Sequence, residues 1–259
     1  MLSALENHIT KVMTHFGDSC YAWDVANEVM GDNAQMRESF WYTTTGMEFL
    51  QTAFKTANSV KKSLGLKTKL YYNDYNTNVV NPKSTAVLNM IKGLPDAGIT
   101  VDGVGFQSHF GFSDQASASE QVENYERFTA LGLEIALTEL DVTASSSSPS
   151  SDEQAQQPNV YKNTISTCKQ VEKCVGVTIW GYDDNYSWLS TKAPRRLRDI
   201  VRPNGAPRCT GVFICRAAAA AGASPTFHDT VIQRLAHQFR VRSAGLIPRR
   251  TEQDKHARF

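Results

Sequence analysis

The sequence predicts an α/β fold in which helices cover a parallel β-sheet. Short strand-like runs alternate with longer helical stretches through most of the first 190 residues. The runs are apolar throughout and do not alternate between apolar and polar residues, which is typical of parallel strands that are buried on both faces. A cluster of polar residues follows nearly every run, which indicates that the strands end at a common functional edge.

Five segments are predicted to be strands: residues 21–27, 69–76, 102–109, 134–141 and 175–183. The polar clusters that follow them are Asn27-Glu28, Asn73–Asn76, Gln107–His109, Glu139–Asp141 and Asp183–Asn185. A (β/α)₈ barrel brings the carboxyl ends of all its strands to one face, where the active site lies. The alternative is a doubly wound sheet, but no glycine-rich nucleotide-binding motif follows any strand. We therefore predict a barrel.

The intervening helices are recognised by apolar residues at helical spacing. Three are predicted, over residues 46–65, 84–98 and 117–132. The third is expected to begin with a capping box made by Ser117 and Glu120. The polar, low-complexity segment 143–158 is predicted to be a mobile loop.

The composition divides the chain at about residue 190. The net charge of +1 conceals 13 Lys/Arg against 22 Asp/Glu in residues 1–190, and 14 against 4 in residues 191–259, where 12 of the 14 are arginine. All tryptophans and tyrosines precede residue 190. We predict a domain over residues 1–190 and an arginine-rich segment of irregular structure over 191–259, with at most a helix around residues 229–238.

Several classes of protein are not expected. No apolar run approaches the roughly 18 residues of a membrane span, and the amphipathic N-terminus lacks the features of a signal peptide. None of the five cysteines forms a CxxC pair and the histidines are scattered, so no metal site is predicted. Cys168 and Cys174 are close enough in sequence to form a local disulfide, but two free thiols fit the residues equally well.

Two carboxylates end predicted strands in similar settings. Glu28 follows WDVAN and Glu139 follows EIALT. Glycoside hydrolysis requires two carboxyl groups that flank the scissile bond, one to donate a proton and one to attack or to activate water. Either residue alone could be a solvated strand end. Because a barrel would place both on one face beside His109, together they predict a catalytic pair.

The motifs WDVANE, YYNDYN, GVGFQSHF, LTELDV and WGYDDNYSW resemble, in this order, those of family 10 glycoside hydrolases, which are retaining endo-1,4-β-xylanases. The resemblance covers residues 4–190 or so and implies that Glu28 is the acid/base and Glu139 the nucleophile. Asn27 would bind the 2-hydroxyl of the sugar at the cleavage site. His109 and Gln107 would bind or orient the nucleophile, with Asp141 behind His109.

The resemblance also implies the walls of the substrate cleft. Trp180 and Trp188 would enclose the sugar on the non-reducing side of the scissile bond, and Tyr75 and Asn76 would line the cleft. Fungal members carry a Cys-x₅-Cys bridge at this place, which implies a Cys168–Cys174 disulfide. The expected substrates are xylan and xylo-oligosaccharides. We expect no cofactor, no nucleic-acid or membrane partner, a monomer, and an extracellular location without a signal peptide in this chain.

In the family, the strand that ends in Glu28 is the fourth of eight. The chain is therefore expected to hold strands 4 to 8 of an incomplete barrel, without a counterpart of the first three βα units, and to depart from the family after about residue 190. Five strands of a closed barrel leave two exposed edges. The alternatives are an inactive or sugar-binding remnant, and a nucleic-acid-binding role for residues 191–259.

Overall fold

The computed structural model describes residues 1–112, 114, 116–144, 149–181 and 187–191. The chain divides into two compact units, residues 1–215 and 216–259, and all described residues belong to the first. The predicted helix around residues 229–238, the rest of 192–259 and the polar cluster at residues 183–185 lie outside the described residues.

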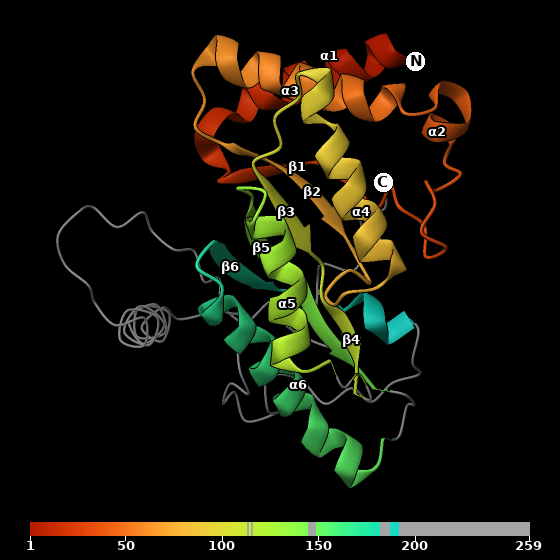
Figure 1. Cartoon of the computed structure of the whole chain (residues 1–259), viewed down its shortest axis with the longest axis vertical. Coiled ribbons are helices and arrows are strands. Elements are labelled where there is room, and N and C mark those ends of the chain that lie inside the picture. Colours follow the sequence, from red (N-terminus) through yellow and green to blue (C-terminus); the bar gives the residue numbers. More distant parts are fainter. Residues whose placement is uncertain (113, 115, 145–148, 182–186, 192–259) are drawn as a thin grey trace, which may run out of the picture. The chain divides into compact units, whose positions relative to one another are not determined.

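The centre of the described unit is a parallel β-sheet (Figure 1). Its strands are β1 (Ala22–Asn27), β2 (Lys69–Asp74), β3 (Gly103–Phe106), β4 (His109–Gly111), β5 (Glu134–Thr143) and β6 (Cys174–Ile179). The strands β1, β2, β3, β5 and β6 are neighbours in chain order, and every pairing is parallel. The short β4 continues the line of β3 and pairs with the second half of β5.

The order of the strands distinguishes a barrel from a doubly wound sheet. In a doubly wound sheet, the chain returns past its first strand and continues in the opposite direction. Here each of these five strands is added on the same side of the previous one. This confirms the predicted partial (β/α)₈ barrel. Within the described residues β1 and β6 each pair with one strand, so they form the two edges of the sheet.

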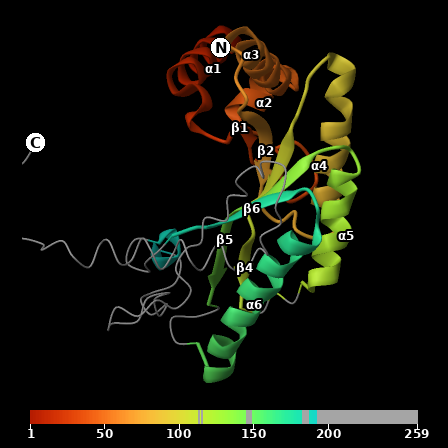
Figure 2. The same cartoon turned by 90° about the vertical axis from the view of Figure 1, so that its left-hand side faces the viewer.

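The helices are α1 (Leu2–Phe16), α2 (Phe40–Thr45), α3 (Glu48–Leu64), α4 (Pro82–Gly93), α5 (Ala118–Thr129) and α6 (Ser151–Gln170). Single 3₁₀ turns occupy Gly17–Ser19, Pro95–Ala97 and Trp188–Thr191. Helices α4, α5 and α6 lie over one face of the sheet, and α1 packs against α3 (Figures 1 and 2). The predicted capping box is present, because Ser117 Oγ accepts from the N–H of Glu120 and Glu120 Oε2 accepts from the N–H of Ser117.

Two predictions about the helices need correction. The helix predicted over residues 84–98 ends at Gly93, because Pro95 cannot donate a helical hydrogen bond and starts a separate turn. The segment 143–158 was predicted to be a loop, but residue 143 belongs to β5 and residues 151–158 form the start of α6. Ser150 and Glu153 form a capping box there, a signal that the polar composition concealed.

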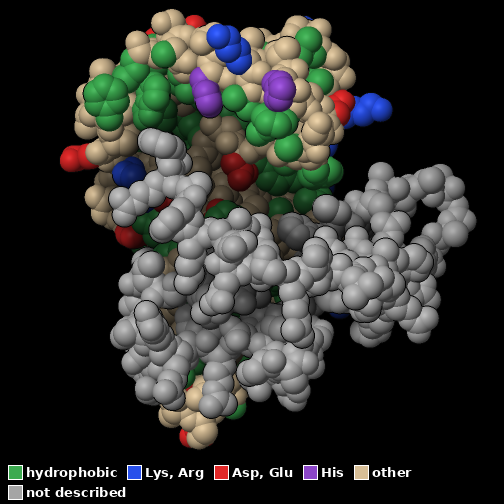
Figure 3. Space-filling model, turned by 180° about the vertical axis from the view of Figure 1, so that it is seen from behind, with side chains coloured by type: hydrophobic (Ala, Val, Ile, Leu, Met, Phe, Trp, Pro, Cys, Tyr) green, Lys and Arg blue, Asp and Glu red, His purple; other side chains and the backbone are tan. Residues whose placement is uncertain are grey.

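The core lies between the sheet and α3, α4 and α5. It contains the fully buried aromatic side chains of Phe54, Tyr72, Phe106, Tyr125 and Phe128. Seen from behind, further hydrophobic side chains gather over the end of the molecule that carries α1, α2 and α3 (Figure 3). No helix among the described residues is both long enough and apolar enough to cross a membrane.

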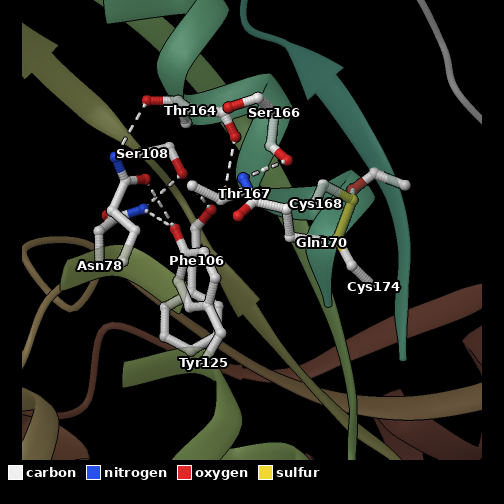
Figure 4. The surroundings of a disulfide bond; sticks show 12 residues. Asn78, Phe106, Ser108, Tyr125, Thr164, Ser166, Thr167, Cys168, Gln170 and Cys174 are labelled. Carbon is white, nitrogen blue, oxygen red and sulfur yellow. Dashed lines mark hydrogen bonds between the residues drawn. A yellow bond between two sulfur atoms is a disulfide. The ribbon is translucent and has the colours of Figure 1, made fainter. Parts of the chain in front are cut away.

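A disulfide joins Cys168, near the end of α6, to Cys174, the first residue of β6 (Figure 4). Their Cα atoms are 5.1 Å apart, within the normal range for such a bond. The predicted pairing is therefore confirmed. It closes the turn through which the chain passes from the outer helix layer into the last strand of the sheet.

Candidate active site

The carboxyl ends of three successive strands are marked by an unusual backbone. Glu28 after β1, Asn76 after β2 and Ser108 after β3 have φ angles of 54°, 53° and 66°. Residues other than glycine rarely adopt such left-handed conformations, which cost of order 1 kcal/mol and cluster at functional sites. The chain accepts this strain where the polar side chains of the predicted site gather.

A chain of side-chain amides joins the two predicted catalytic carboxylates. Gln107 Nε2 donates to Glu28 Oε1 at 3.0 Å and to Asn27 Oδ1 at 3.1 Å. Asn73 Nδ2 donates to the same Asn27 oxygen at 3.0 Å and to Glu139 Oε1 at 2.8 Å. Two N–H groups thus fix the amide oxygen of Asn27. Its Nδ2 group therefore points away from both donors.

Asn73 is the site residue that the sequence analysis missed most clearly. It is 1% exposed and lies across β3, where its Oδ1 also accepts from Thr138 Oγ1 at 2.7 Å. It can lie there because residue 105 is glycine, since any side chain at that position would overlap the Asn73 amide. The sequence held one signal, a glycine inside a predicted buried strand, which often marks a close approach.

His109 lies between the nucleophile candidate and a second carboxylate. Its Nε2 is 3.5 Å from Glu139 Oε2, and its Nδ1 is 2.8 Å from Asp141 Oδ1. The indole of Trp188 donates to the other Asp141 oxygen at 2.7 Å and meets the imidazole edge-on, with ring centres 5.1 Å apart. The structure thus brings together His109, Glu139, Asp141 and Trp188.

The electrostatics of His109 follow from these contacts. Burial acts to lower the pKa of His109, but hydrogen bonds with Asp141 and Glu139, and their charges, outweigh it and raise the pKa to about 9. The imidazole is therefore protonated at neutral pH. It places a positive charge beside Glu139, and both of its ring nitrogens act as donors.

A second cluster surrounds Asp32, on the loop after β1. The carboxylate accepts from Tyr75 at 3.1 Å, from Asn76 at 3.4 Å and from Lys83 at 3.2 Å. Partial burial opposes the effect, but these hydrogen bonds and the Lys83 charge hold the pKa of Asp32 below its ordinary value. Lys83 is 4% exposed, also pairs with the buried Asp74 at 3.0 Å, and lies 3.4 Å above the Tyr75 ring.

Arg37 connects the two clusters. Its guanidinium donates to the Tyr75 hydroxyl at 3.1 Å and lies 3.5 Å from Glu28 Oε2. An open cavity of about 690 Å³ adjoins these groups. It is lined by Gly31, Asp32, Asn33, Gln35, Met36, Arg37, Glu38, Tyr42 and Tyr75. Asp32 and Arg37 were not predicted to be site residues, because they belong to a loop without periodic pattern. Lys83 was not predicted, because it belongs to a helix.

Trp180 follows β6 and is held by its backbone, whose N–H donates to the Leu140 carbonyl at 3.0 Å. The residue is 47% exposed. Within the described residues, no group of three or more His, Cys, Asp and Glu side chains is placed to hold a metal ion.

The sequence that builds this arrangement was compared with known protein families. The sequence model described as glycosyl hydrolase family 10 matches residues 1–203. The chain belongs to this family. The match extends beyond residue 190, where the sequence analysis placed the boundary of its first domain.

Two curated family 10 relatives illustrate the similarity. Endo-1,4-beta-xylanase 5 of Pyricularia oryzae is 36% identical over 258 residues, which is 95% of this chain and 62% of the relative. Endo-1,4-beta-xylanase A of Humicola insolens is 41% identical over 184 residues, 71% of this chain and 47% of the relative. The chain thus spans less than two thirds of the length of either protein.

Solved structures agree with the sequence comparisons. The family 10 xylanase from Bispora sp. MEY-1, crystallised with xylobiose, is similar with a TM-score of 0.75 and 38% identity, over 82% of this chain and 64% of that structure. A glycosylated endo-beta-1,4-xylanase from Gloeophyllum trabeum gives a TM-score of 0.69 and 40% identity, over 78% and 62%.

Proposed function

We propose that this family 10 chain carries the site of a retaining endo-1,4-β-xylanase, with Glu28 as acid/base and Glu139 as nucleophile. The observation that supports this most directly is the amide chain through Gln107, Asn27 and Asn73, which links Glu28, after β1, to Glu139, inside β5. The assignment of xylan as substrate is supported by the names of the relatives.

In the first proposed step, a Glu139 oxygen attacks the anomeric carbon of a xylosyl unit. The glycosidic C–O bond breaks, and Glu28 gives its proton to the leaving oxygen. Protonated His109 places a positive charge 3.5 Å from Glu139 and helps to orient its carboxylate for the attack. Asp141 and Trp188 keep the imidazole in place.

In the second step, Glu28 has lost its proton and acts as the base. It removes a proton from water, whose oxygen attacks the anomeric carbon and releases Glu139, so the product has the configuration of the substrate. The outward Nδ2 of Asn27 is suited to donate to the 2-hydroxyl of the sugar. We assign Tyr75 and Asn76, beside the open cavity, and the exposed Trp180 to the walls of the substrate cleft.

The direct test is turnover by the full chain. Purified protein is incubated with xylohexaose, reducing ends are measured over time, and the anomeric configuration of the first product is read by proton NMR. Turnover with a β-anomeric product, lost in Glu139→Gln, supports the proposal. An α-anomeric product would contradict the assignment of Glu139 as nucleophile. Restoration of turnover in Glu28→Ala by azide, with formation of a β-xylosyl azide, would identify Glu28 as acid/base.

A second candidate is binding of xylo-oligosaccharides without turnover. The structure of the sheet favours this candidate. The described residues form five successive barrel strands and leave two edges, whereas the closed barrel of this fold has eight strands. Calorimetric titration with xylohexaose separates the candidates, because heat of binding without release of reducing ends identifies the binding protein. Loss of binding in Asn27→Ala would locate the ligand at the same strand ends.

The Cys168–Cys174 disulfide bears on where the protein works. Disulfides persist in oxidising compartments and are rare in the cytosol. We therefore include an extracellular location in the proposal. Quantifying the chain in culture medium and in cell lysate by mass spectrometry tests it, and detection in the lysate alone would contradict it.

A further inference from the structure

The backbone between Gln107 and His109 is the feature that connects the two halves of the site. Gln107 donates to Glu28, and His109 contacts Glu139. Ser108 stands between them with a φ angle of 66° and no exposed surface. The conformation of this single residue therefore decides whether both neighbours can reach their carboxylates at once.

The Ser108 hydroxyl is fixed by two hydrogen bonds. It donates to the carbonyl oxygen of Phe106 at 3.0 Å and accepts from Asn78 Nδ2 at 2.7 Å. The same Asn78 nitrogen donates to the Tyr125 hydroxyl at 2.8 Å, and that hydroxyl donates to Gln121 Oε1 at 3.2 Å. Figure 4 shows the side chains of Asn78, Ser108 and Tyr125 close together.

The direction of each bond follows from the donors that are present. The hydroxyl hydrogens of Ser108 and Tyr125 are used on Phe106 and Gln121, so both hydroxyls act as acceptors toward Asn78. Only the NH₂ side of the amide can serve two acceptors, which fixes the orientation of Asn78. Its exposed fraction is 5%, and Tyr125 and Gln121 are fully buried, so no solvent can replace this donor.

The loop that carries Asn78 is itself bound to α5 and to the end of β2 by hydrogen bonds. The fully buried Asn124 of α5 donates from its Nδ2 to the Thr77 carbonyl at 2.7 Å. Thr77 also donates from its hydroxyl to the carbonyl of Asp74, at the end of β2. The position of Asn78 is therefore fixed relative to α5 and β2. Its hydrogen bond to the Ser108 hydroxyl fixes Ser108 relative to the same elements.

We propose that Asn78 is a positioning residue for the glycosidase reaction. Through the Ser108 hydroxyl it holds the left-handed turn that directs Gln107 toward Glu28 and His109 toward Glu139. The inference rests on the proposed function of these carboxylates, and Asn78 touches neither of them. A serine in this conformation is strained, and the hydrogen bonds to Phe106 and Asn78 offset the strain. Glycine at position 108 would adopt the same turn without help.

This difference between serine and glycine provides the test. In the full chain, Asn78→Ala should lower kcat about ten- to a hundredfold, because small misplacements of catalytic groups cost that much, while KM changes by less than about threefold. In a Ser108→Gly background, the same Asn78→Ala change should alter kcat by less than about twofold. An equal loss of kcat in both backgrounds would overturn the proposal.

Asn58→Ala is the matched control. Asn58 donates to the carbonyls of Phe54 and Thr100 on α3 and the loop after α4, away from the strand ends. Asn58→Ala should lower the midpoint temperature of thermal unfolding and leave kcat unchanged. An Asn78→Ala variant that behaves like this control, with a lower midpoint and unchanged kcat, would show that Asn78 is only structural.

A second readout does not depend on turnover. The pKa of His109 is measured by NMR titration of the full chain, with its signals assigned from their absence in His109→Gln. Asn78→Ala should lower the value from about 9 toward 6.5, because His109 moves away from Asp141 and Glu139, and Ser108→Gly should restore it. An unchanged pKa in Asn78→Ala would overturn the inference. If the wild-type chain shows no turnover but the variants show these changes in the His109 pKa, the proposed function is refuted and the positioning role of Asn78 is not.

Discussion

The two ends of the sheet carry carboxylates with different hydrogen-bond donors. At the amino ends of the strands, Glu134 Oε2 accepts from the hydroxyls of Tyr21 and Tyr71, each at 2.9 Å, and its Oε1 lies 3.4 Å from Lys69. Burial, followed by the hydrogen bond and charge of Glu134, raises the pKa of Tyr21 to about 12, so the hydroxyl remains a donor. The charge of Glu134 is met by a cation and two hydroxyls.

At the carboxyl ends, neutral amides supply the short hydrogen bonds to the carboxylates. Asn73 and Gln107 donate to Glu139 and Glu28, and the cations His109 and Arg37 lie 3.5 Å from them, nearly the distance between Lys69 and Glu134. An amide orients a carboxylate without cancelling its charge, which remains able to attack or to accept a proton. In barrels of this class, stability resides at the amino face and chemistry at the carboxyl face. The contrast between Glu134 and Glu139 follows that division.

The largest expected effect compares these two glutamates directly. Glu139→Gln should lower kcat/KM for xylohexaose by more than about a thousandfold, because the amide cannot form the covalent intermediate. Glu134→Gln should leave kcat within about twofold but reduce the free energy of unfolding by about 1–3 kcal/mol, since three partners lose their acceptor charge. Urea denaturation and initial rates measure both. A large loss of rate in Glu134→Gln would contradict the division of roles.

The next largest effect is the contribution of His109 to the pH dependence of the free energy of unfolding. The folded pKa of about 9 lies above the ordinary value of 6.5, so the stabilisation is fully present below pH 6.5 and is lost as the pH rises through 9. Urea denaturation of the full chain between pH 6 and 9.5 or so should show a loss of up to about 3 kcal/mol. The His109→Gln variant should lack this slope. An identical slope in the variant would assign it to other groups.

Much of this architecture could be predicted because it depends on local patterns. Apolar strands, helical spacing and the Ser117 capping box gave the order of elements, and the motifs around Glu28 and Glu139 gave the pair of carboxylates. The break at Pro95 and the start of α6 after Ser150 were missed, although both have local signals. In each case the composition or the spacing of apolar residues was given more weight than one specific residue, Pro95 or Ser150.

The supporting residues could not be predicted, because their roles exist only between elements. Asn73 reads as a turn residue in YYNDYN, yet it reaches Glu139 across β3 because Gly105 leaves room. Asp32 and Arg37 come from a loop without periodicity, and their importance depends on where Tyr75 arrives from the next strand. Such contacts join residues about 40 positions or more apart, beyond the reach of any local pattern.

A smaller effect on stability and kcat is expected from a substitution at Gly105, which leaves room for the Asn73 amide. Gly105→Ala should cost about 2 kcal/mol of unfolding free energy and lower kcat about tenfold, because the methyl group displaces the Asn73 amide from Glu139. Gly93→Ala is the matched control, since a Cβ there meets nothing within 4 Å and alanine favours the helix. It should be neutral or slightly stabilising. A Gly105→Ala variant with full activity would show that the position of Asn73 is not critical.

The smallest effect concerns the amino face alone. Asp102 Oδ2 accepts from the backbone N–H of Leu70 at 2.9 Å and from Lys61 Nζ at 2.7 Å, which ties α3 to the start of β2. Lys61→Met should cost about 1 kcal/mol, because the pair is partly exposed and screened, and the cost should shrink in high salt. Lys55→Met on the same helix, at an exposed position, should cost less. Since the carboxyl face is untouched, kcat should stay constant in both variants. A fall in kcat confined to Lys61→Met would mean that the two ends of the sheet are coupled, and the separation of stability from chemistry would then be incomplete.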